Sequence, residues 1–350
     1  AAGMNFLLDF HYSDTWTDPN KQKIPASWID HSDEALASVL YTYTKATVTN
    51  LIANGAAPDY VQIGNEITYG LLWNTSDGNY PTSSNLYASA GYCPTWSSTY
   101  STGTAQWRRT ASLLNNAAHA VHQAFADNTL DSTQVKIIVH TEMGKAEATS
   151  DNFYRHIENA GFRNYDIIGL SYYPTYHGAL SVLGSLLTTL KSHFPSKPVH
   201  IVETAWNNAW YPEDATYSIG ELSSNWTADS QGQINYLTDL IAYLDDTNVQ
   251  GLYYWQPEEC GSGYQSAVMS TWMNRGLWQC GSGQTHSLVA SGTSSSVAAL
   301  ATFATGSEAE AETTDWTSSI VDSDFESSAH FNWDNGPWNP GDGFYLWDST

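Results

Sequence analysis

Short apolar runs alternate along the chain with longer segments in which apolar residues recur at helical spacing. The apolar runs cover residues 4–10, 60–63, 135–139, 167–170, 199–202 and 251–255. Runs of this length predict strands that are buried on both faces, as in a parallel sheet. The segments with helical periodicity cover 33–54, 105–125, 151–160, 179–190 and 230–244. Strict alternation of strands and helices predicts an α/β fold, either a (β/α) barrel or a doubly wound sheet.

Polar and aromatic residues follow each predicted strand at its carboxyl end. These segments are 11–16, 65–66, 140–142, 171–174, 203–206 and 255–258. Functional groups from six strands on one rim are typical of a barrel, whereas a doubly wound sheet concentrates its site at one switch point. No glycine-rich phosphate loop follows any of these strands. We therefore predict a (β/α)8 TIM barrel, of which this chain shows six strands.

Two of the strands end in a glutamate, Glu66 in Val-Gln-Ile-Gly-Asn-Glu and Glu203 in Val-His-Ile-Val-Glu. Carboxylates held at the mouth of a parallel sheet can form the acid/base and nucleophile pair of a glycosidase. Either residue alone could instead cap its strand or pair with a surface cation. With 12 Lys and Arg against 36 Asp and Glu, most acidic side chains lack a basic partner, so only the pair is informative.

Composition favours a neutral sugar as the ligand. Charged residues make up 14% of the 350 residues, where about 25% is usual, and the chain contains 15 Trp and 22 Tyr. Aromatic rings stack on the apolar faces of sugars, and neutral polar groups bond their hydroxyls. A net charge of −24 repels phosphate backbones and anionic lipids, so we expect no nucleic-acid or membrane partner. No apolar run is long enough to span a membrane.

Cysteines and glycosylation motifs indicate whether the protein is located inside or outside the cell. Cys260 and Cys280 could close a loop of about twenty residues, which would suit an oxidising environment; free thiols are the alternative. Cys93 is expected to be free. Triplets that match the N-glycosylation motif begin at Asn74 and Asn225. No signal peptide is recognisable at the start of the chain, but we expect a secreted, extracellular protein that is monomeric.

The composition of the last part of the chain differs from that of the rest. Residues 1–305 carry the strand and helix pattern, 306–315 are acidic and rich in small residues, and 316–350 are dense in Asp, Ser, Trp and Gly without a helical period. We interpret these segments as a barrel, a linker and the start of an appended β-sandwich module. A disordered acidic tail is the alternative for the last segment.

Five segments in order resemble the arabinogalactan endo-β-1,4-galactanases of glycoside hydrolase family 53. They are Asp-Phe-His-Tyr-Ser-Asp-Thr-Trp at 9–16, Gly-Asn-Glu-Ile at 64–67, Ser-Tyr-Tyr-Pro at 171–174, Glu-Thr-Ala-Trp at 203–206 and Tyr-Tyr-Trp-Gln-Pro at 253–257. These segments resemble the family's strands three, four, six, seven and eight. The resemblance runs from residue 1 to about residue 300, so it is far more specific than any single motif.

The resemblance implies endo-cleavage of β-1,4-galactan with retention of anomeric configuration. Glu66 would be the general acid/base, Glu203 the nucleophile and Asn65 the partner of the sugar 2-hydroxyl, while a tyrosine of the sixth strand could stabilise ionised Glu203. We expect the following residues to bind substrate: His11, Asp14, Trp16, His140, Tyr172, Tyr173, Trp206 and Trp255. We expect no metal or other cofactor. Some bacterial members bind calcium, but Glu213 and Asp214 alone supply too few oxygens for it.

The sequence also departs from the family pattern. Members carry two βα units before the Asp-Phe-His motif, including an arginine that helps hold the nucleophile, and this chain begins at the third unit. An open six-strand sheet would expose two edges. We therefore expect the chain as given to be inactive or prone to aggregation. Restoring roughly eighty to ninety N-terminal residues is expected to rescue activity.

Two other functions fit part of the pattern. The first is a retaining endo-glycanase of the same clan that acts on mannan, xylan or β-glucan, because the two glutamates are shared across that clan. The Ser-Asp-Thr-Trp and Ser-Tyr-Tyr-Pro segments favour galactan. The second is a non-catalytic carbohydrate-binding barrel. Retention of both Glu66 and Glu203 argues against it, because binding alone does not need them.

Overall fold

The computed structural model describes residues 5–74, 91–93, 105–143, 148–207, 226–227, 229–245, 247–257 and 275–277. Several sequence predictions lie outside these residues: the Cys260–Cys280 bridge, the glycosylation motif at Asn225, the Glu213–Asp214 pair and the division of residues 306–350. Cys93 is buried and carries a free thiol, as expected.

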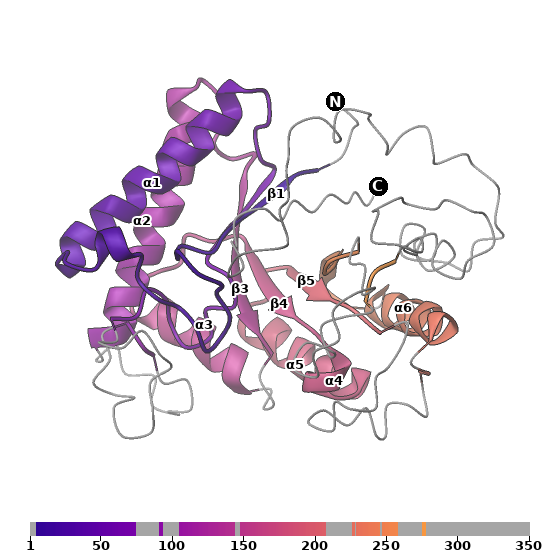
Figure 1. The fold of residues 1–350 in the computed structure, drawn as a ribbon. Coiled ribbons are helices and arrows are strands. Elements are labelled where there is room, and N and C mark those ends of the chain that lie inside the picture. The colour runs from indigo at the N-terminus through magenta and orange to yellow at the C-terminus, as the bar shows by residue number, and fades with distance from the viewer. Residues whose placement is uncertain are drawn as a thin grey trace, which may run out of the picture.

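Six parallel strands form one sheet, in which each strand pairs with the next along the chain (Figure 1). The strands are β1 (Leu7–Phe10), β2 (Tyr60–Ile63), β3 (Lys136–Glu142), β4 (Ile167–Ser171), β5 (Val199–Thr204) and β6 (Val249–Tyr254). Every strand predicted from an apolar run is present. Within the described residues, β1 and β6 are the two edges of the sheet.

Helices follow the strands as the periodicity predicts. They are α1 (Asp33–Ala53), α2 (Ala105–Asp127), α3 (Ala148–Asn159), α5 (Leu180–His193) and α6 (Ser230–Asp245). The short α4 (Pro174–His177) and the 3-10 turn η1 (Ala26–Trp28) were not predicted, because segments this short show no helical period. No helix in the described part of the chain has the length and apolarity needed to cross a membrane.

Local signals explain the bounds of α1. The Ser32 side chain accepts a hydrogen bond from the Ala35 N–H, and Asp33 and Glu34 lie in the first turn, where the helix dipole favours negative charge. The helix ends before Gly55, whose φ of 77° suits a residue without a side chain. In Figure 1, α1 lies along α2 on the outside of the sheet.

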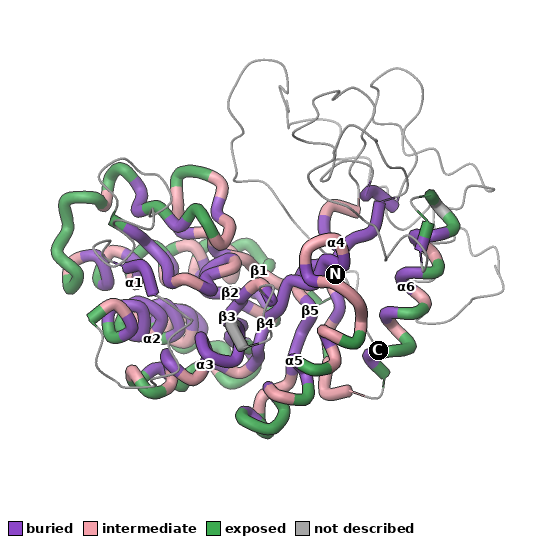
Figure 2. Tube along the Cα trace, turned by 90° about the horizontal axis from the view of Figure 1, so that it is seen from below, coloured by how far each residue is buried: buried purple, intermediate pink, exposed green. Residues whose placement is uncertain are grey.

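The sheet is curled, and residues from non-adjacent strands meet across its inner face. The ring of Tyr60 in β2 lies 5.4 Å from the ring of His200 in β5. At the carboxyl end, the rings of Trp16 and Trp255 lie 5.8 Å apart in an edge-on contact. Figure 2 shows buried residues along the strands and exposed residues on the outer sides of the helices. The predicted barrel architecture is therefore present as an open, curled half-barrel in the part that the structure describes.

Candidate active site

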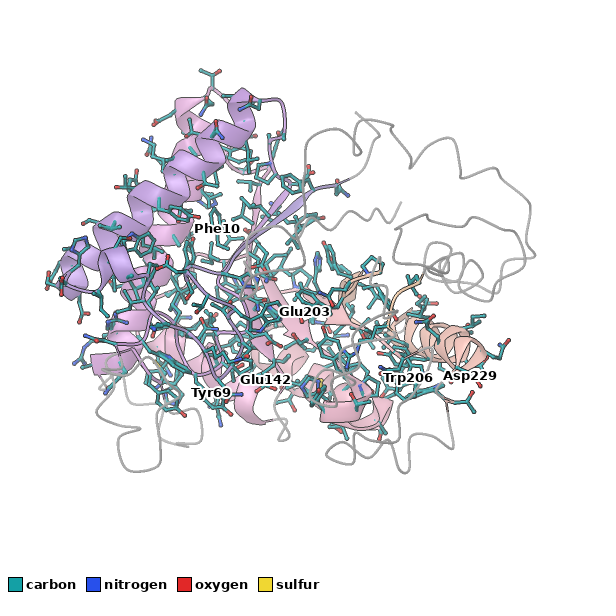
Figure 3. The ribbon with its side chains drawn as sticks, viewed as in Figure 1. Phe10, Tyr69, Glu142, Glu203, Trp206 and Asp229 are labelled. Carbon is teal, nitrogen blue, oxygen red and sulfur yellow. The ribbon has the colours of Figure 1, made fainter. Side chains whose placement is uncertain are left out.

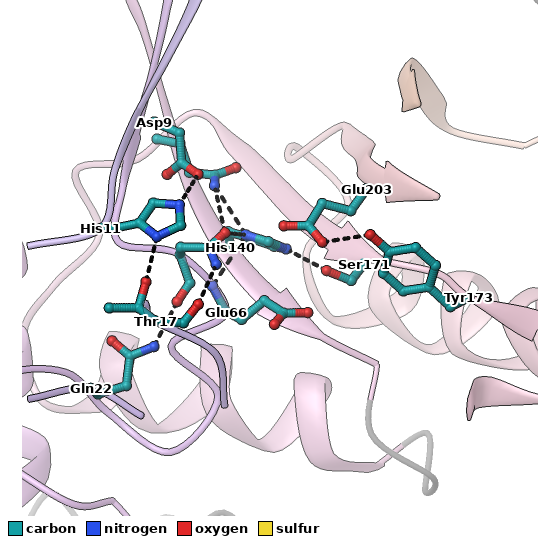
Figure 4. Close-up of polar contacts among 11 residues, drawn as sticks. Asp9, His11, Thr17, Gln22, Glu66, His140, Ser171, Tyr173 and Glu203 are labelled. Atoms are coloured by element: carbon teal, nitrogen blue, oxygen red, sulfur yellow. Dashed lines mark hydrogen bonds and ion pairs between the residues drawn. The ribbon is translucent and has the colours of Figure 1, made fainter. Parts of the chain in front are cut away.

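Glu66 and Glu203 meet at the carboxyl ends of their strands, as the sequence predicts. Glu66 lies three residues after the end of β2, and Glu203 is the fifth residue of the six in β5. One carboxylate oxygen of each residue and one ring nitrogen of His140 all lie within 4.8 Å of one another. Figure 4 shows the two carboxylates pointing toward the same space, with His140 beside them. Both groups can therefore reach one bound atom.

The segment before Glu66 has an unusual backbone. Gly64 has a φ of 110°, and Glu66 itself adopts a left-handed φ of 48°. A left-handed conformation is uncommon for residues other than glycine and persists where the surroundings hold it. Here the Glu66 N–H donates to Nδ1 of His140 at 3.1 Å, and the Ile67 N–H donates to the His140 carbonyl at 2.9 Å. The third strand thus fixes the direction of the Glu66 side chain.

Asn65 is buried beside this segment and is bonded to the loop that follows β1. Its side-chain amide donates to the Thr17 carbonyl at 3.1 Å, and its own carbonyl accepts from the Gln22 side chain at 2.7 Å. These bonds join the strand-end segments of β1 and β2.

His140 is fully buried behind the two carboxylates. Nδ1 lies 3.1 Å from the Glu66 backbone nitrogen, 3.0 Å from the Gln62 amide nitrogen and 3.0 Å from Oδ1 of Asn65. Because the two nitrogens can only donate, we assign Nδ1 as an acceptor and the proton to Nε2. Nε2 then donates to the Ser171 hydroxyl at 2.8 Å. Burial lowers the pKa of His140 to about 3, so the ring is neutral. The structure therefore places His140 against protein groups, whereas the sequence suggested a sugar contact.

Ser171 lies beside both carboxylates. Its hydroxyl lowers the pKa of Glu66 and the pKa of Glu203. A hydroxyl has one proton, so it can serve one carboxylate at a time. Because His140 occupies the acceptor side of the hydroxyl, the serine proton is directed toward the carboxylates.

Glu203 is 7% exposed, and Tyr173 donates to its Oε2 at 2.8 Å. Burial raises the pKa of Glu203 to about 7, although the hydrogen bond from Tyr173 opposes this increase. The negative charge of Asp9 raises the pKa further, and the charge of His11 lowers it. The bond from a tyrosine at the carboxyl end of β4 corresponds to the stabilisation expected from the sequence.

The pKa of Glu66 lies well above the ordinary value for a glutamate. Burial is the main cause, and the charge of Glu203 adds to it; the charges of Glu142 and Asp18 act in the same direction, while Ser171 opposes them. Glu203 has a tyrosine hydroxyl to stabilise its charge, and Glu66 faces three other acidic groups. The environment therefore leaves the proton of the pair on Glu66 and the negative charge on Glu203.

His11 lies at the β1 end of the site. Its Nε2 is 3.2 Å from the Asp9 carboxylate, and its Nδ1 shares a 2.7 Å hydrogen bond with the Thr17 hydroxyl. Burial lowers the pKa of His11, but the charge and hydrogen bond of Asp9 outweigh it, so the net shift is upward. Trp16 contacts this ring edge-on, with the ring centres 6.2 Å apart.

The remaining predicted substrate residues occupy different positions. Trp16 and Trp255 contact each other at the mouth of the sheet. Trp206 is 1% exposed, and its ring nitrogen donates to the Thr227 carbonyl at 2.9 Å. The Tyr172 hydroxyl donates to the Gly178 carbonyl at 2.8 Å. Asp14 is exposed and accepts a 2.6 Å bond from the Ala26 N–H. Thus Trp206 and Tyr172 bond protein groups inside the fold.

Sequence reasoning missed other residues near the site. Glu142, labelled in Figure 3, ends β3. His177 in α4 contacts its Oε2 at 3.3 Å. Glu142 lies in a strand-end segment that the sequence singled out, but it was not assigned a role. Arg275 lies with its guanidinium carbon 5.1 Å from the centre of the Tyr173 ring. No local pattern marks Arg275, because it lies in a segment that carries neither a strand nor a helix period.

Within the described residues, one group of three metal-binding side chains converges, formed by Glu66, His140 and Glu203. The imidazole is poorly suited to a metal, because Nδ1 already accepts two donors and Nε2 carries the proton toward Ser171. The group is better described as a carboxylate pair with a supporting histidine.

A sequence profile of glycosyl hydrolase family 53 matches residues 1–303. The chain belongs to this family. It is 33% identical over 264 residues to the arabinogalactan endo-β-1,4-galactanase of Cellvibrio japonicus, covering 73% of this chain and 62% of that protein. It is 35% identical over 267 residues to an uncharacterised protein of Niallia circulans, covering 73% of this chain and 64% of the relative. The chain thus spans less than two thirds of the length of these two relatives.

A solved structure of two fungal β-1,4-galactanases has the same fold, with a TM-score of 0.62 and 28% identity over 80% of this chain and 76% of that one. The family membership and this structural similarity confirm the family and the architecture inferred from the five ordered segments.

Proposed function

We propose that this protein is an endo-β-1,4-galactanase that hydrolyses galactan or arabinogalactan with retention of configuration. Membership of glycosyl hydrolase family 53 supports the reaction class. Its similarity to the Cellvibrio japonicus arabinogalactan endo-β-1,4-galactanase supports the substrate. Aromatic residues at the mouth of the sheet and the shortage of charge also favour a neutral polysaccharide.

The observation that carries the proposal is the closeness of Glu66 and Glu203. They have carboxylate oxygens within 4.8 Å of each other. In retaining glycosidases the two carboxyl groups stand about 5–5.5 Å apart, whereas inverting enzymes leave about 6.5–9.5 Å for a water molecule. The short separation supports double displacement.

In the first step, Glu203 attacks the anomeric carbon while Glu66 gives its proton to the departing glycosidic oxygen. A bond forms between the sugar and Oε of Glu203, and the bond to the leaving sugar breaks. In the second step, Glu66 takes a proton from water, and the water oxygen displaces Glu203. The required starting state has a proton on Glu66 and a charge on Glu203, the arrangement that their surroundings favour.

We assign supporting roles from position. Asn65 would bond the sugar 2-hydroxyl, since the amide that donates to Thr17 has a second N–H. Trp255 would lie under the sugar at the cleavage point, with Trp16 beside it. His11 and Tyr173 border the carboxylates. For His140 we propose a positioning role, because its ring nitrogens bond Glu66, Gln62 and Ser171.

Incubation with linear β-1,4-galactan and with β-mannan, in parallel, tests the proposal, using the 350-residue chain beside the N-terminally extended chain that is expected to restore activity. We expect shorter oligosaccharides from galactan only, and loss of this activity in Glu66→Gln and Glu203→Gln. Glu158→Gln is the matched control, because Glu158 pairs with Arg163 at 2.6 Å, away from the site. Cleavage of mannan in place of galactan would assign the chain to another substrate. Binding of galactan without cleavage would support the non-catalytic alternative.

We further propose that the protein acts as a secreted monomer. A polymeric polysaccharide does not cross membranes, so the enzyme must meet it outside the cell. Size-exclusion chromatography with light scattering measures the oligomeric state.

A further inference from the structure

Arg275 is a buried cation beside the site. The residue is 1% exposed, and its guanidinium carbon lies 5.1 Å from the centre of the Tyr173 ring. Its backbone is well anchored, since its carbonyl accepts hydrogen bonds from the Gln233 side chain at 3.0 Å and from the Tyr254 hydroxyl at 2.8 Å. The backbone of Arg275 is therefore fixed in the fold, and its guanidinium lies over the Tyr173 ring.

The same tyrosine contacts Glu203 at its other end. The Tyr173 hydroxyl donates to Oε2 of Glu203 at 2.8 Å. Tyr173 therefore has a cation on its ring and a carboxylate at its hydroxyl. A cation over a phenol ring stabilises the ring's electron density. The hydroxyl becomes a stronger donor, and a stronger bond to a carboxylate favours the ionised form of that carboxylate.

We propose that Arg275 is a positioning residue that keeps Glu203 ionised by acting through the ring of Tyr173. This inference deepens the proposed function, because it takes Glu203 to be the nucleophile. The surrounding charge supports it. The chain has 12 Lys and Arg against 36 Asp and Glu, so a cation buried against the ring of Tyr173 is an exception to its composition. Burying a guanidinium is unfavourable unless neighbouring groups compensate for it.

Other charged and titratable groups also act on these two residues. Glu203 is influenced by Asp9 and His11 from the β1 side and is coupled to Glu66 after β2. Tyr173 is influenced by Glu203 and Glu66, which raise its pKa, while the charge of Arg275 lowers it; burial is the largest cause of the net increase. The backbone N–H of Tyr173 donates to Nδ1 of His177 at 2.9 Å. A test must therefore separate the effect of Arg275 from the coupled titration of Glu66.

The experiment is a double-mutant cycle in the 350-residue chain, carried out in a Glu66→Gln background so that Glu203 titrates without its coupled partner. The chain is labelled with glutamate that carries ¹³C at the side-chain carboxyl. The Glu203 signal is assigned by its loss in Glu203→Gln. Its pKa is then measured in four proteins: the Glu66→Gln parent, and this parent with Arg275→Gln, with Tyr173→Phe, and with both changes.

We expect Arg275→Gln to raise the pKa of Glu203 by about half a unit to one unit. Tyr173→Phe should raise it by at least as much, and adding Arg275→Gln to Tyr173→Phe should change nothing further. Equal effects of Arg275→Gln with and without the Tyr173 hydroxyl would overturn the inference, because the arginine would then act on Glu203 directly. No shift in either single variant would overturn it as well.

Two controls address folding and specificity. Arg275→Lys keeps a cation at the buried position and should shift the pKa less than Arg275→Gln. Arg163→Gln removes an exposed cation that pairs with Glu158, and should have no effect. If Arg275→Gln loses its cooperative thermal transition, Arg275→Lys replaces it in the cycle, with the same requirement that its effect vanish in Tyr173→Phe. The titration uses no galactan, so its outcome does not depend on whether the chain cleaves galactan, and failure of the inference and failure of the proposed function are distinguishable.

Discussion

The backbone N–H of Glu66 donates to Nδ1 of His140 at 3.1 Å, and this bond holds a glutamate whose φ is 48°. A neutral, buried imidazole from β3 thus supports a strained residue after β2. The other ring nitrogen bonds Ser171 at 2.8 Å, and the Ser171 hydroxyl lowers the pKa of both glutamates. Together these contacts fix the acid/base candidate relative to the nucleophile candidate, and they give His140 a role that can be measured.

Replacing His140 by alanine should lower kcat on galactan by about 10- to 100-fold and change KM little, because Glu66 loses the contact that orients it. Steady-state kinetics on linear galactan separate the two constants. His122→Ala, on α2, is the control and should behave like the unmodified protein. A rise in KM at constant kcat would instead support the direct sugar contact expected from the sequence.

The pH dependence of kcat/KM should be bell-shaped with its acidic limb near pH 7, because burial raises the pKa of Glu203 to about 7 and protonated Glu203 cannot attack. The basic limb reports loss of the proton that Glu66 must donate, and burial raises the pKa of Glu66 well above its ordinary value.

Tyr173→Phe should move the acidic limb to higher pH, since its hydrogen bond lowers the pKa of Glu203. Tyr172→Phe is the matched control, because that hydroxyl bonds the Gly178 carbonyl instead. An acidic limb that stays in place in Tyr173→Phe would contradict the assigned hydrogen bond.

Much of the fold is readable from the chain. Each of the six strands lies within three residues of its apolar run, because several positions of each strand are apolar. The positions of Glu66 and Glu203 follow from the same rule, since the carboxyl ends of parallel strands share one rim. The pairing of Trp16 with Trp255 could not be predicted, because it depends on how far the sheet curls.

The burial of individual aromatic and polar side chains also could not be predicted from the sequence. Trp206 lies three residues after Glu203, and the sequence suggested that it binds the sugar. In the structure its ring nitrogen donates to the Thr227 carbonyl instead. The sequence also suggested that His140 binds the sugar, but the structure buries its ring behind the carboxylates. Residues in a strand-end segment alternate between the site and the interior, and the register shift between Ile201 and Thr204 changes that alternation.

Gly64→Ala should reduce activity and stability together. Gly64 has a φ of 110°, and an added Cβ would lie 2.8 Å from Cγ2 of Ile67, so the turn that carries Glu66 must shift. Gly161→Ala is the matched control, with a φ of 102° and no atom within 4 Å of the added Cβ. Both variants should lose about 1–3 kcal/mol from backbone strain. Only Gly64→Ala should also lose kcat, and equal kinetics for the two would contradict this account.

His200 should make the protein sensitive to acid. Burial between the rings of Tyr60 and Tyr253 lowers its pKa to about 4, so the folded state resists a proton that the unfolded state accepts below about pH 6.5. The contribution of His200 to the free energy of unfolding is complete above pH 6.5. As the pH falls toward 4, this contribution decreases by on the order of 3 kcal/mol.

His200→Leu should therefore flatten the decline in unfolding free energy between pH 7.5 and pH 4.5, as measured by urea denaturation. His119→Leu removes an exposed histidine on α2 and should leave the decline unchanged. An equally steep decline in His200→Leu would assign the acid sensitivity to other groups.

The most direct test of the central assignment is to trap the covalent intermediate. A 2-deoxy-2-fluoro-β-galactobioside with a good leaving group should slow the second step and leave the sugar attached to the enzyme. Peptide mass spectrometry should find the added disaccharide on Glu203, and Glu203→Gln should remain unlabelled. A label on any other residue, or release of product with inverted configuration and no trapped species, would contradict the assignment of Glu203 as nucleophile.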